Sequence, residues 1–310
     1  MADNAKLTEF KMNIMIPYRP CCMGYFKSPA GELRQQDDNN WLAVKTGVVH
    51  NETDEYEKKI VSLRTCISAI NARSRFKHKI MVVMDSDVFP NSNFMKQFDN
   101  VTVVKSDRPI ADVMQTYEDA RLRLAGSLQS GIDALNDDEE WVMYGYAADS
   151  LPSIDWDFHL MEAINRHGDG KVYAPMFIEG SQGHHPETVG VQLTSGYIWA
   201  ERTSGLLNFP DPRADYFTIE DFDHFANVAR EGNVGDQVEN CGDRGYGHAS
   251  AMLMKAKYIK KVGIRFGDWD MMGFAVDNAL KRICDLQKVI ITNAFILHPM
   301  CWHLEMRLPY

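Results

Sequence analysis

The chain has 310 residues, of which 45% are hydrophobic and 25% are charged, and its formal net charge is −10. This composition is typical of a globular protein and excludes collagen-like, coiled-coil and mainly disordered chains. The acidic balance also argues against strong non-specific binding to nucleic acid, because no basic field dominates the sequence.

No stretch approaches the ~18 consecutive apolar residues that a membrane-spanning helix needs. The N-terminal residues Met1 to Lys6 are polar and lack the apolar core of a secretory signal peptide. We therefore expect a cytoplasmic protein with no transmembrane segment. The six cysteines include no CxxC pair, which predicts reduced and mostly buried thiols.

Short apolar segments alternate with helical patterns over the first 175 residues. Apolar runs rich in strand-forming residues predict strands at 11–17, 79–84, 101–104, 141–144 and 171–174. Apolar residues at helical spacing predict helices that begin at Thr53, and at 117–135 and 155–166. The polar segment 19–51 is predicted to be a long loop or a small insertion.

This alternation predicts an α/β fold with a mostly parallel central sheet and helices on both faces. Ligands of such sheets bind at the carboxyl ends of the strands. Polar groups follow three predicted strands there, at Pro17 to Arg19, at Asp85 to Asp87 and at Asp149. We therefore expect these three segments to converge on one crevice.

The second half of the chain is less regular. It predicts one or two strands at 189–199, a strand at 248–254, helices at 255–262 and 277–286, and a final strand at 288–297. That last strand ends at His298. No repeat or clear linker interrupts the chain, so we expect a single domain over 1–310 whose two halves, about 10–175 and 176–310, share one sheet.

Several common catalytic motifs are absent from the sequence. It contains no GxGxxG or GxxxxGK[ST] phosphate loop, no GxSxG elbow and no HExxH helix, which argues against dehydrogenases, P-loop ATPases, lipases and zinc proteases. The remaining candidates are carboxylates at strand ends and a late histidine. Such hard oxygen ligands with an imidazole suit Mg²⁺ or Mn²⁺, and these ions commonly neutralise a diphosphate.

The order of these segments resembles the GT-A fold glycosyltransferases of the family-2-like group. The segments that carry the resemblance are Ile14-Met-Ile-Pro-Tyr18, Val82 to Asp87, Ala120-Arg121 with Gly126 and Gly131 to Ala134, Ala147-Ala-Asp-Ser-Leu-Pro152, and Gly273 to Asp277 followed by Leu297-His298. Together they span roughly residues 12 to 300. The resemblance implies a Rossmann-like nucleotide-binding half followed by an acceptor-binding and catalytic half.

The resemblance also implies the site. The donor would be a nucleotide-diphosphate sugar, by family habit a UDP-sugar. Asp149 and His298 would hold Mn²⁺ or Mg²⁺, which stabilises the leaving diphosphate. Asp277 would act as the base that takes the proton of the acceptor hydroxyl. The residues expected to bind the nucleotide are Pro17, Tyr18, Arg19, Asp85, Asp87, Arg121 and Asp149.

Three positions depart from the family pattern. Ala147 replaces the first acid of the usual DxD, Arg19 stands where Asn usually follows the first strand, and Val276 replaces an acid beside Asp277. A non-catalytic nucleotide- or glycan-binding protein of degenerate GT-A fold is therefore one alternative. A nucleotidyltransferase is the other, although the glycine-rich loop of that class is missing after Pro17. Each aspartate also has a structural alternative as a turn or helix cap, and His303 competes with His298.

The acceptor is open between a glycan, a protein, a small molecule and a modified nucleobase in DNA. A DNA acceptor would need a basic surface, and Lys255, Lys257, Lys260, Lys261 and Arg265 cluster in the sequence. The alternative is that these residues form an ordinary solvated helix face.

Overall fold

The structure is a computed structural model. It describes residues 8–18, 25–27, 33–37, 40–44, 63, 66–85, 95–106, 127–146, 148, 150–179, 190–193, 196–199, 219–232, 235–239, 251–262 and 286–298. The predicted helix at 277–286, apart from Leu286, and the beginning of the helix predicted from Thr53 lie outside these residues. Of the helix predicted at 117–135, the structure describes a helical segment at 127–133.

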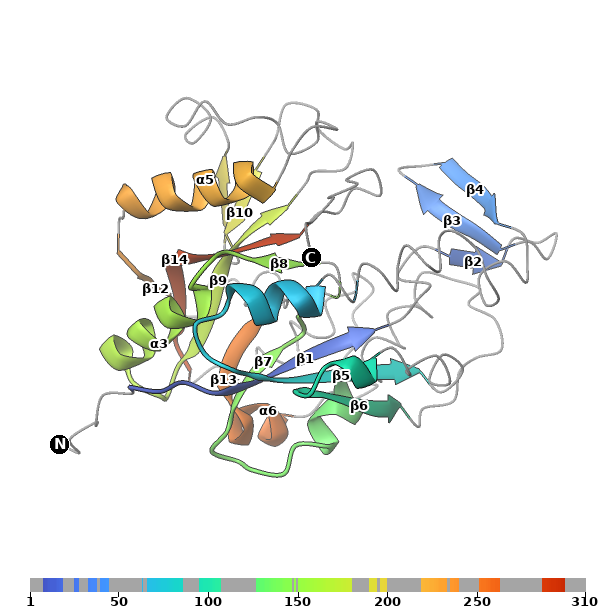
Figure 1. The fold of residues 1–310 in the computed structure, drawn as a ribbon, viewed down its shortest axis with the longest axis horizontal. Helices are drawn as coiled ribbons and strands as arrows, with labels where there is room; N and C mark the ends of the chain where they lie inside the picture. The colour runs from blue at the N-terminus through green and yellow to red at the C-terminus, as the bar shows by residue number, and fades with distance from the viewer. Residues whose placement is uncertain are drawn as a thin grey trace.

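Among the described residues, nine strands pair into the central sheet (Figure 1). They are β1 (Met12–Tyr18), β5 (Lys79–Asp85), β6 (Val101–Ser106), β7 (Trp141–Tyr144), β8 (Leu151–Pro152), β9 (Val172–Glu179), β12 (Gln237–Glu239), β13 (Met252–Lys255) and β14 (Lys288–His298). Their order is β12, β14, β9, β13, β7, β1, β5, β6, and β8 pairs with β14 outside that path. Strands from both predicted halves of the chain therefore pair in one sheet.

The sheet is mixed, so the prediction of a mostly parallel sheet is wrong. The pairs β7–β1, β1–β5, β5–β6 and β9–β14 are parallel, but β13 is antiparallel to both of its neighbours, β7 and β9. β12 and β8 are also antiparallel to β14. The apolar run of β13 is buried on both faces, as a parallel strand would be, so its hydrophobic pattern carries no information about its direction.

Side chains of the sheet alternate between two hydrophobic clusters, one on each face. Along β1, Ile14 and Ile16 belong to one cluster and Met15 to the other. The helical segment 66–73 and α3 (Trp156–His167) cover the first face, while the helical segment 127–133 and α6 (Ala256–Val262) cover the second (Figure 1). Burial on both faces explains why the strands are continuously apolar.

Residues 25–44 contain a small separate sheet, so of the two predictions for 19–51, a long loop or a small insertion, the small insertion agrees with the structure. Its strands are β2 (Tyr25–Lys27), β3 (Leu33–Asp37) and β4 (Asn40–Val44), paired in that order and antiparallel. Only two residues separate Asp37 from its partner Asn40, a spacing typical of a tight hairpin. The polar residues of β3 concealed this hairpin, because the expected hydrophobic alternation of a strand is missing there.

The second half contains a helix that was not predicted from the sequence, α5 (Ile219–Glu231). Phe222 and Ala226 are buried and lie one helical turn apart, and this spacing was the available signal. β10 (Gly190–Leu193) and β11 (Gly196–Trp199) form an antiparallel pair, which confirms two strands within 189–199. Within the described helices, none combines the length and the apolar character that crossing a bilayer requires.

Candidate functional site

The carboxyl ends of β1, β5 and β14 lie at the same edge of the central sheet. β1 and β5 are parallel, and Tyr18 at the end of β1 pairs with Met84, one residue before Asp85. β14 runs in the same direction as β1, because the two antiparallel pairings of β13 reverse the direction twice. The last residue of β14, His298, therefore belongs to this edge as well.

The structure thus brings the backbones of Tyr18, Asp85 and His298 to one edge, although their side chains lie outside the described set. Pro17 is half-buried and faces Val83 in the ladder. The remaining predicted site residues lie outside the described residues, namely Arg19, Asp87, Arg121, Asp149 and Asp277. The roles of all of these residues stay predictions.

The chain crosses this edge between Tyr146 and Leu151. The amide of Tyr146 donates to the Met15 carbonyl of β1 at 3.0 Å, and Leu151 pairs with Leu297 on the side of β14 away from β9. Tyr146 continues β7, which lies four strand spacings from β8, so on a flat sheet the crossing would span about 19 Å. The five residues of the crossing can reach only about 17 Å. The sheet must therefore curl, which brings the end of β14 toward the end of β1.

Ser150 lies inside this crossing and is fully buried. Its hydroxyl has no hydrogen-bond partner, whereas its carbonyl accepts from the Tyr146 hydroxyl at 3.4 Å. Continuing the antiparallel register by one residue beyond Leu151 and Leu297 places Ser150 opposite His298. A buried hydroxyl without a partner is costly, so this oxygen is a candidate ligand at the edge.

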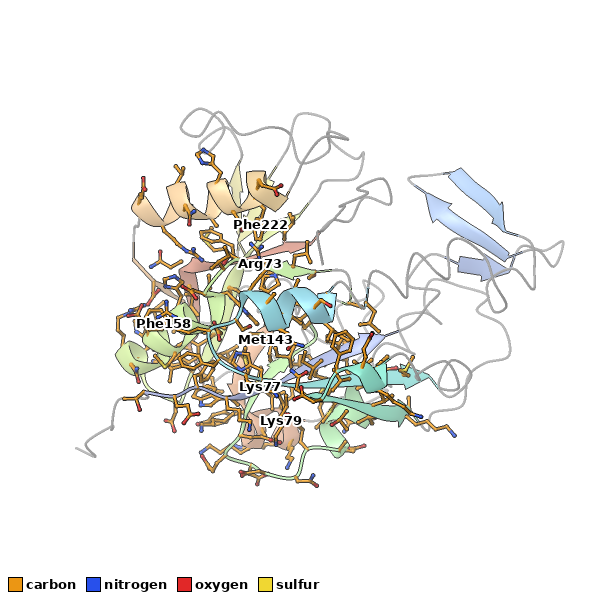
Figure 2. The ribbon with its side chains drawn as sticks, in the orientation of Figure 1. Arg73, Lys77, Lys79, Met143, Phe158 and Phe222 are labelled. Atoms are coloured by element: carbon orange, nitrogen blue, oxygen red, sulfur yellow. The ribbon has the colours of Figure 1, made fainter. Side chains whose placement is uncertain are left out.

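Arg73 holds the turn that follows the crossing. Only 5% of its side chain is exposed, and its Nε donates to the Pro152 carbonyl at 2.6 Å. Its Nη2 forms an ion pair with Asp223 of α5, and its guanidinium lies 5.8 Å from the centroid of the Phe222 ring. Figure 2 shows Arg73 and Phe222 close together between the helical segment 66–73 and α5.

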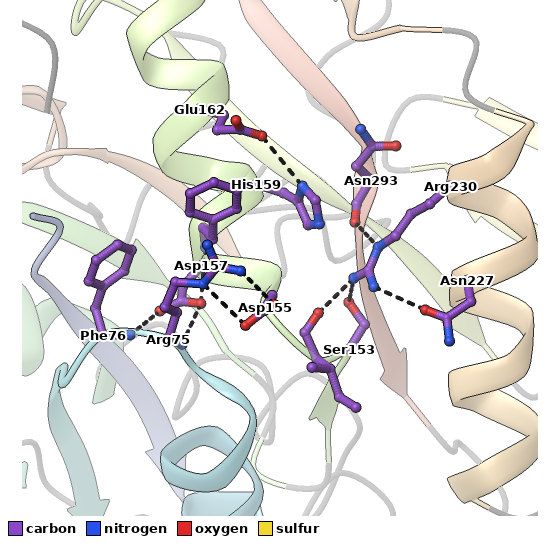
Figure 3. Close-up of polar contacts among 12 residues, drawn as sticks. Arg75, Phe76, Ser153, Asp155, Asp157, His159, Glu162, Asn227, Arg230 and Asn293 are labelled. Carbon is purple, nitrogen blue, oxygen red and sulfur yellow. Dashed lines mark hydrogen bonds and ion pairs between the residues drawn. The ribbon is translucent and has the colours of Figure 1, made fainter. Parts of the chain in front are cut away.

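Arg230 of α5 holds the same turn from another side (Figure 3). Its Nη2 donates to the Ser153 hydroxyl at 2.9 Å and to the Ile154 carbonyl at 2.7 Å. Its Nε donates to the Asn293 carbonyl of β14 at 2.9 Å, where the pairing of β14 with β9 shifts register. Burial lowers the pKa of this guanidinium, while Asp155 and Asp223 raise it.

Asp157 is a buried carboxylate at the beginning of α3, just beyond the turn. It accepts from the amides of Arg75 and Phe76 at 2.9 and 2.8 Å, and it lies 3.0 Å from the Nε2 of His78. Burial raises the pKa of Asp157, but these hydrogen bonds outweigh burial and hold that pKa below its usual range. With every oxygen occupied, Asp157 anchors the segment before β5.

The lysines of the predicted basic cluster are largely paired with acidic partners. Lys257 contacts the Glu139 carboxylate at 2.8 Å, and Lys260 contacts Asp138 at 2.8 Å. Lys255 donates to the Glu139 carbonyl at 2.6 Å. This arrangement favours the solvated helix face over a basic docking surface, and Arg265 lies outside the described part of the chain.

A complete metal centre is not found among the described side chains, which include no group of three or more His, Cys, Asp or Glu residues able to hold an ion. The side chains predicted to hold the metal, those of Asp149 and His298, do not belong to that set. The one described cysteine, Cys66, is buried and forms no disulfide, as the sequence predicts, and the other five lie outside the described ranges.

No known protein family matches the sequence, and no curated protein matches it. Among solved structures, the chain is similar to GalNAc-T7 in its structure with UDP, GalNAc and Mn²⁺, at 11% identity and a TM-score of 0.50. That match covers 96% of this chain but 45% of GalNAc-T7. A looser match, at 10% identity and a TM-score of 0.38, is 4-diphosphocytidyl-2C-methyl-D-erythritol synthase from Anaerococcus prevotii, over 95% of this chain and 88% of that one.

At 11% identity, the similarity to GalNAc-T7 establishes the fold alone. The chain has a GT-A-like α/β fold with a mixed sheet, and it corresponds to less than half of the GalNAc-T7 chain. The resemblance predicted from the sequence is therefore confirmed at the level of the fold. Nothing in the comparison favours the family-2-like group.

Proposed function

We propose that this protein is a metal-dependent glycosyltransferase that moves a sugar from a nucleotide-diphosphate donor, a UDP-sugar, to an acceptor hydroxyl. The observation that carries the proposal is the shared edge of a GT-A-like sheet, where Tyr18, Asp85 and His298 end three strands. Crevices at the carboxyl ends of such strands are where α/β folds bind nucleotides. GalNAc-T7, whose fold is similar, was crystallised with UDP and Mn²⁺.

The end of β1 and the end of β5 would bind the nucleotide. Asp85 or Asp87 would accept hydrogen bonds from the uracil or the ribose, and Pro17, Tyr18 and Arg19 would line the same pocket. Arg121 would contact a phosphate, since a guanidinium matches the geometry of phosphate oxygens.

Asp149 and His298 would hold the Mn²⁺ or Mg²⁺ ion. The fit is supported by the donor set: the unpaired hydroxyl of Ser150 lies just before β8, where the register places Ser150 opposite His298, and Asp149 directly precedes Ser150 in the sequence. When bound, the ion would neutralise the negative charge of the leaving diphosphate. Ser150 would supply an oxygen three residues after Ala147, the residue that replaces the first family acid.

Asp277 is the proposed base. In an inverting transfer, the acceptor oxygen forms the new bond to the sugar as the bond to the diphosphate breaks, and Asp277 takes the proton of the acceptor hydroxyl. The acceptor class stays open between a glycan, a protein, a small molecule and a modified nucleobase in DNA.

The test is the thermal stability of the chain with UDP, GDP, CDP or ADP, each with and without Mn²⁺. A ligand at about 100 times its dissociation constant adds about 2.7 kcal/mol, so UDP with Mn²⁺ should raise the melting temperature visibly. Asp149→Ala should abolish the part of this stabilisation that depends on Mn²⁺. Asp99→Ala is the control, because Asp99 is exposed and its described ion pair is with the exposed Lys77. A parent protein that no nucleotide stabilises would overturn the proposal.

A non-catalytic binding protein of the same fold is the second candidate, and the loss of acids at Ala147 and Val276 favours it. Such a protein would be stabilised by the nucleotide but would release no UDP from a UDP-sugar. A nucleotidyltransferase would instead release pyrophosphate from a nucleoside triphosphate. Assays of UDP and pyrophosphate release, each with Mn²⁺, therefore separate the three activities.

A further inference from the structure

We propose that Arg73 and Arg230 are positioning residues for the metal site, because together they fix the turn 150–155 against the end of β14. The inference rests on the proposed function. In this proposal the arginines neither bind the metal nor react. They hold the segments that would carry Asp149 and His298 in a fixed relative position.

The two proposed ligands come from segments far apart in the sequence. Asp149 comes three residues before Pro152, and His298 comes three residues after Phe295. Between β8 and β14, only Leu151 with Leu297 and Pro152 with Ile296 pair as strand residues. So short a ladder gives the turn few backbone contacts of its own.

Ser153 extends this short contact. Its amide donates to the Phe295 carbonyl at 2.9 Å, and the Phe295 amide donates to the Ser153 hydroxyl at 3.2 Å. Arg230 completes the arrangement, since it binds the Ser153 hydroxyl and the Ile154 carbonyl on one side and the Asn293 carbonyl on the other. One guanidinium therefore joins the turn to the strand that ends at His298.

Arg73 fixes the other side of the turn. It donates to the Pro152 carbonyl and pairs with Asp223, and its own carbonyl accepts from the Asp155 amide at 2.9 Å. Because Asp223 and Arg230 both belong to α5, the two arginines link the nucleotide-binding half to the acceptor-binding half through one turn.

Two partly or fully buried guanidiniums add little net stability, since the cost of their desolvation offsets much of the attraction to their partners. Their contribution is instead to fix the geometry of the turn, because a guanidinium donates hydrogen bonds in several fixed directions at once. A lysine keeps the charge but carries a single nitrogen. Arg→Lys substitutions therefore test geometry separately from charge.

The experiment compares Arg73→Lys and Arg230→Lys with Arg166→Lys in the full chain. Arg166 is a matched control, because it forms the same kind of two-nitrogen contact, with Asp236 at 3.0 and 2.6 Å, at the far end of α3. The measurement is the Mn²⁺ concentration that gives half of the UDP-dependent thermal shift. Both test variants should raise this concentration by roughly 10-fold or more, as loss of supporting contacts around a metal ligand does.

The increase in melting temperature that UDP gives without Mn²⁺ should be the same in both variants as in the parent. A variant that had lost stability throughout the protein would not give this result. Arg166→Lys should keep the parent Mn²⁺ dependence. If an arginine variant fails to fold, Ser153→Ala takes its place, because it removes the hydroxyl shared by Arg230 and the Phe295 amide, and the same rise is expected.

The outcomes separate the two proposals. A parent protein without any Mn²⁺-dependent UDP shift overturns the proposed function and this inference with it. A parent shift that the variants retain at the parent Mn²⁺ concentration overturns only the inference. An equal rise in the Arg166→Lys control would also overturn it, since the effect would then be one of stability.

Discussion

His159 lies on α3 between charges of both signs. Its Nδ1 is buried and 3.7 Å from a Glu162 oxygen, which is too far for a hydrogen bond. Burial lowers the pKa of His159, and the positive charge of Arg230 lowers it further, whereas Glu162 and Asp155 act in the opposite direction. The net result is an imidazole that resists protonation in the folded protein.

This lowered pKa predicts a loss of stability toward acid. The unfolded chain binds the proton at a pKa of about 6.5, while the folded protein still excludes it, so the stabilising contribution is complete above that pH and falls below it. His159→Gln should make the free energy of unfolding less dependent on pH between about pH 6.5 and pH 5. Denaturant melts at several pH values measure this change.

Exposed His224 on α5 offers the control for that experiment. His224→Gln is measured in parallel, so that the loss of an exposed imidazole is compared with the loss of the partly buried one. The same steep slope in His159→Gln would show that another group causes the acid sensitivity.

Contacts at this scale are the part of the protein that the sequence reveals least. Arg73 and Asp223 are 150 residues apart, and each alone resembles an ordinary surface residue of a helix. Asp157 could be predicted only as an acid in the first turn of a helix, where it suits the helix dipole. Its contacts with Arg75, Phe76 and His78 depend on how α3 packs beside the end of the helical segment 66–73.

At the scale of elements, the helical segment 127–133 packs tightly on β1 and β5 at Gly131. A Cβ added there would lie 2.7 Å from the Met15 sulfur and 3.0 Å from a Val83 methyl. Gly131→Ala should therefore destabilise the protein by about 1–3 kcal/mol, because the branched Val83 cannot move aside as easily as Met15. Chemical denaturation gives the value directly.

Gly170→Ala is the comparison, because the nearest atom to its added Cβ is the Tyr258 hydroxyl at 3.7 Å. That change should stay within about 0.5 kcal/mol of the parent, as surface substitutions usually do. Equal stability of the two variants would mean that the helix can shift on the sheet, and that the close approach is unimportant.

The sequence predicts most buried elements well. Strands β1, β5, β6 and β7 and the helices α3 and α6 lie within a few residues of their predicted ranges, because an apolar run or a helical period is a local property. Strand direction and the hairpins of 25–44 are not local in this sense. The direction of a strand depends on which strand it pairs with, and β3 is too polar to be recognised as a strand from its hydrophobic pattern.

The candidate site was predictable only in part. Alternation of strands and helices places Tyr18 and Asp85 at one edge, and this edge is what the structure confirms. The course of β14 to the same edge depends on the antiparallel β13, which no pattern indicates. The burial of the unpaired Ser150 hydroxyl and the hydrogen bonds of Arg230 depend on contacts between segments far apart in the sequence. Neither could therefore be predicted from the sequence.

At the scale of the whole molecule, the two halves share their hydrophobic core. Ile14 and Trp156 of the first half belong to one cluster with Leu253, Val289 and Ile296 of the second. A fragment of residues 1–175 would leave the open side of β7 unpaired and this cluster incomplete. We therefore expect the fragment to lack cooperative thermal unfolding and near-ultraviolet circular dichroism.

Adding the separately expressed residues 176–310 should restore both signals, because association of the two halves completes the sheet and the cluster. A fragment 1–175 that unfolds cooperatively alone would contradict the shared core. It would also mean that the nucleotide-binding half is a domain in its own right, contrary to the single domain expected from the sequence.

The position of β13 has a further consequence for how the protein is made. Ribosomes synthesise β7 and β9 well before β13, the strand that later fills the space between them. Until roughly 75 further residues have emerged, the nascent chain exposes two apolar strands whose backbone groups have no partner on that side. Chaperones that bind extended apolar segments would meet this intermediate, and slower translation of residues 180–250 would prolong its exposure. The yield of folded protein in a cell should therefore depend on the rate of its synthesis, and not only on the stability of the folded protein.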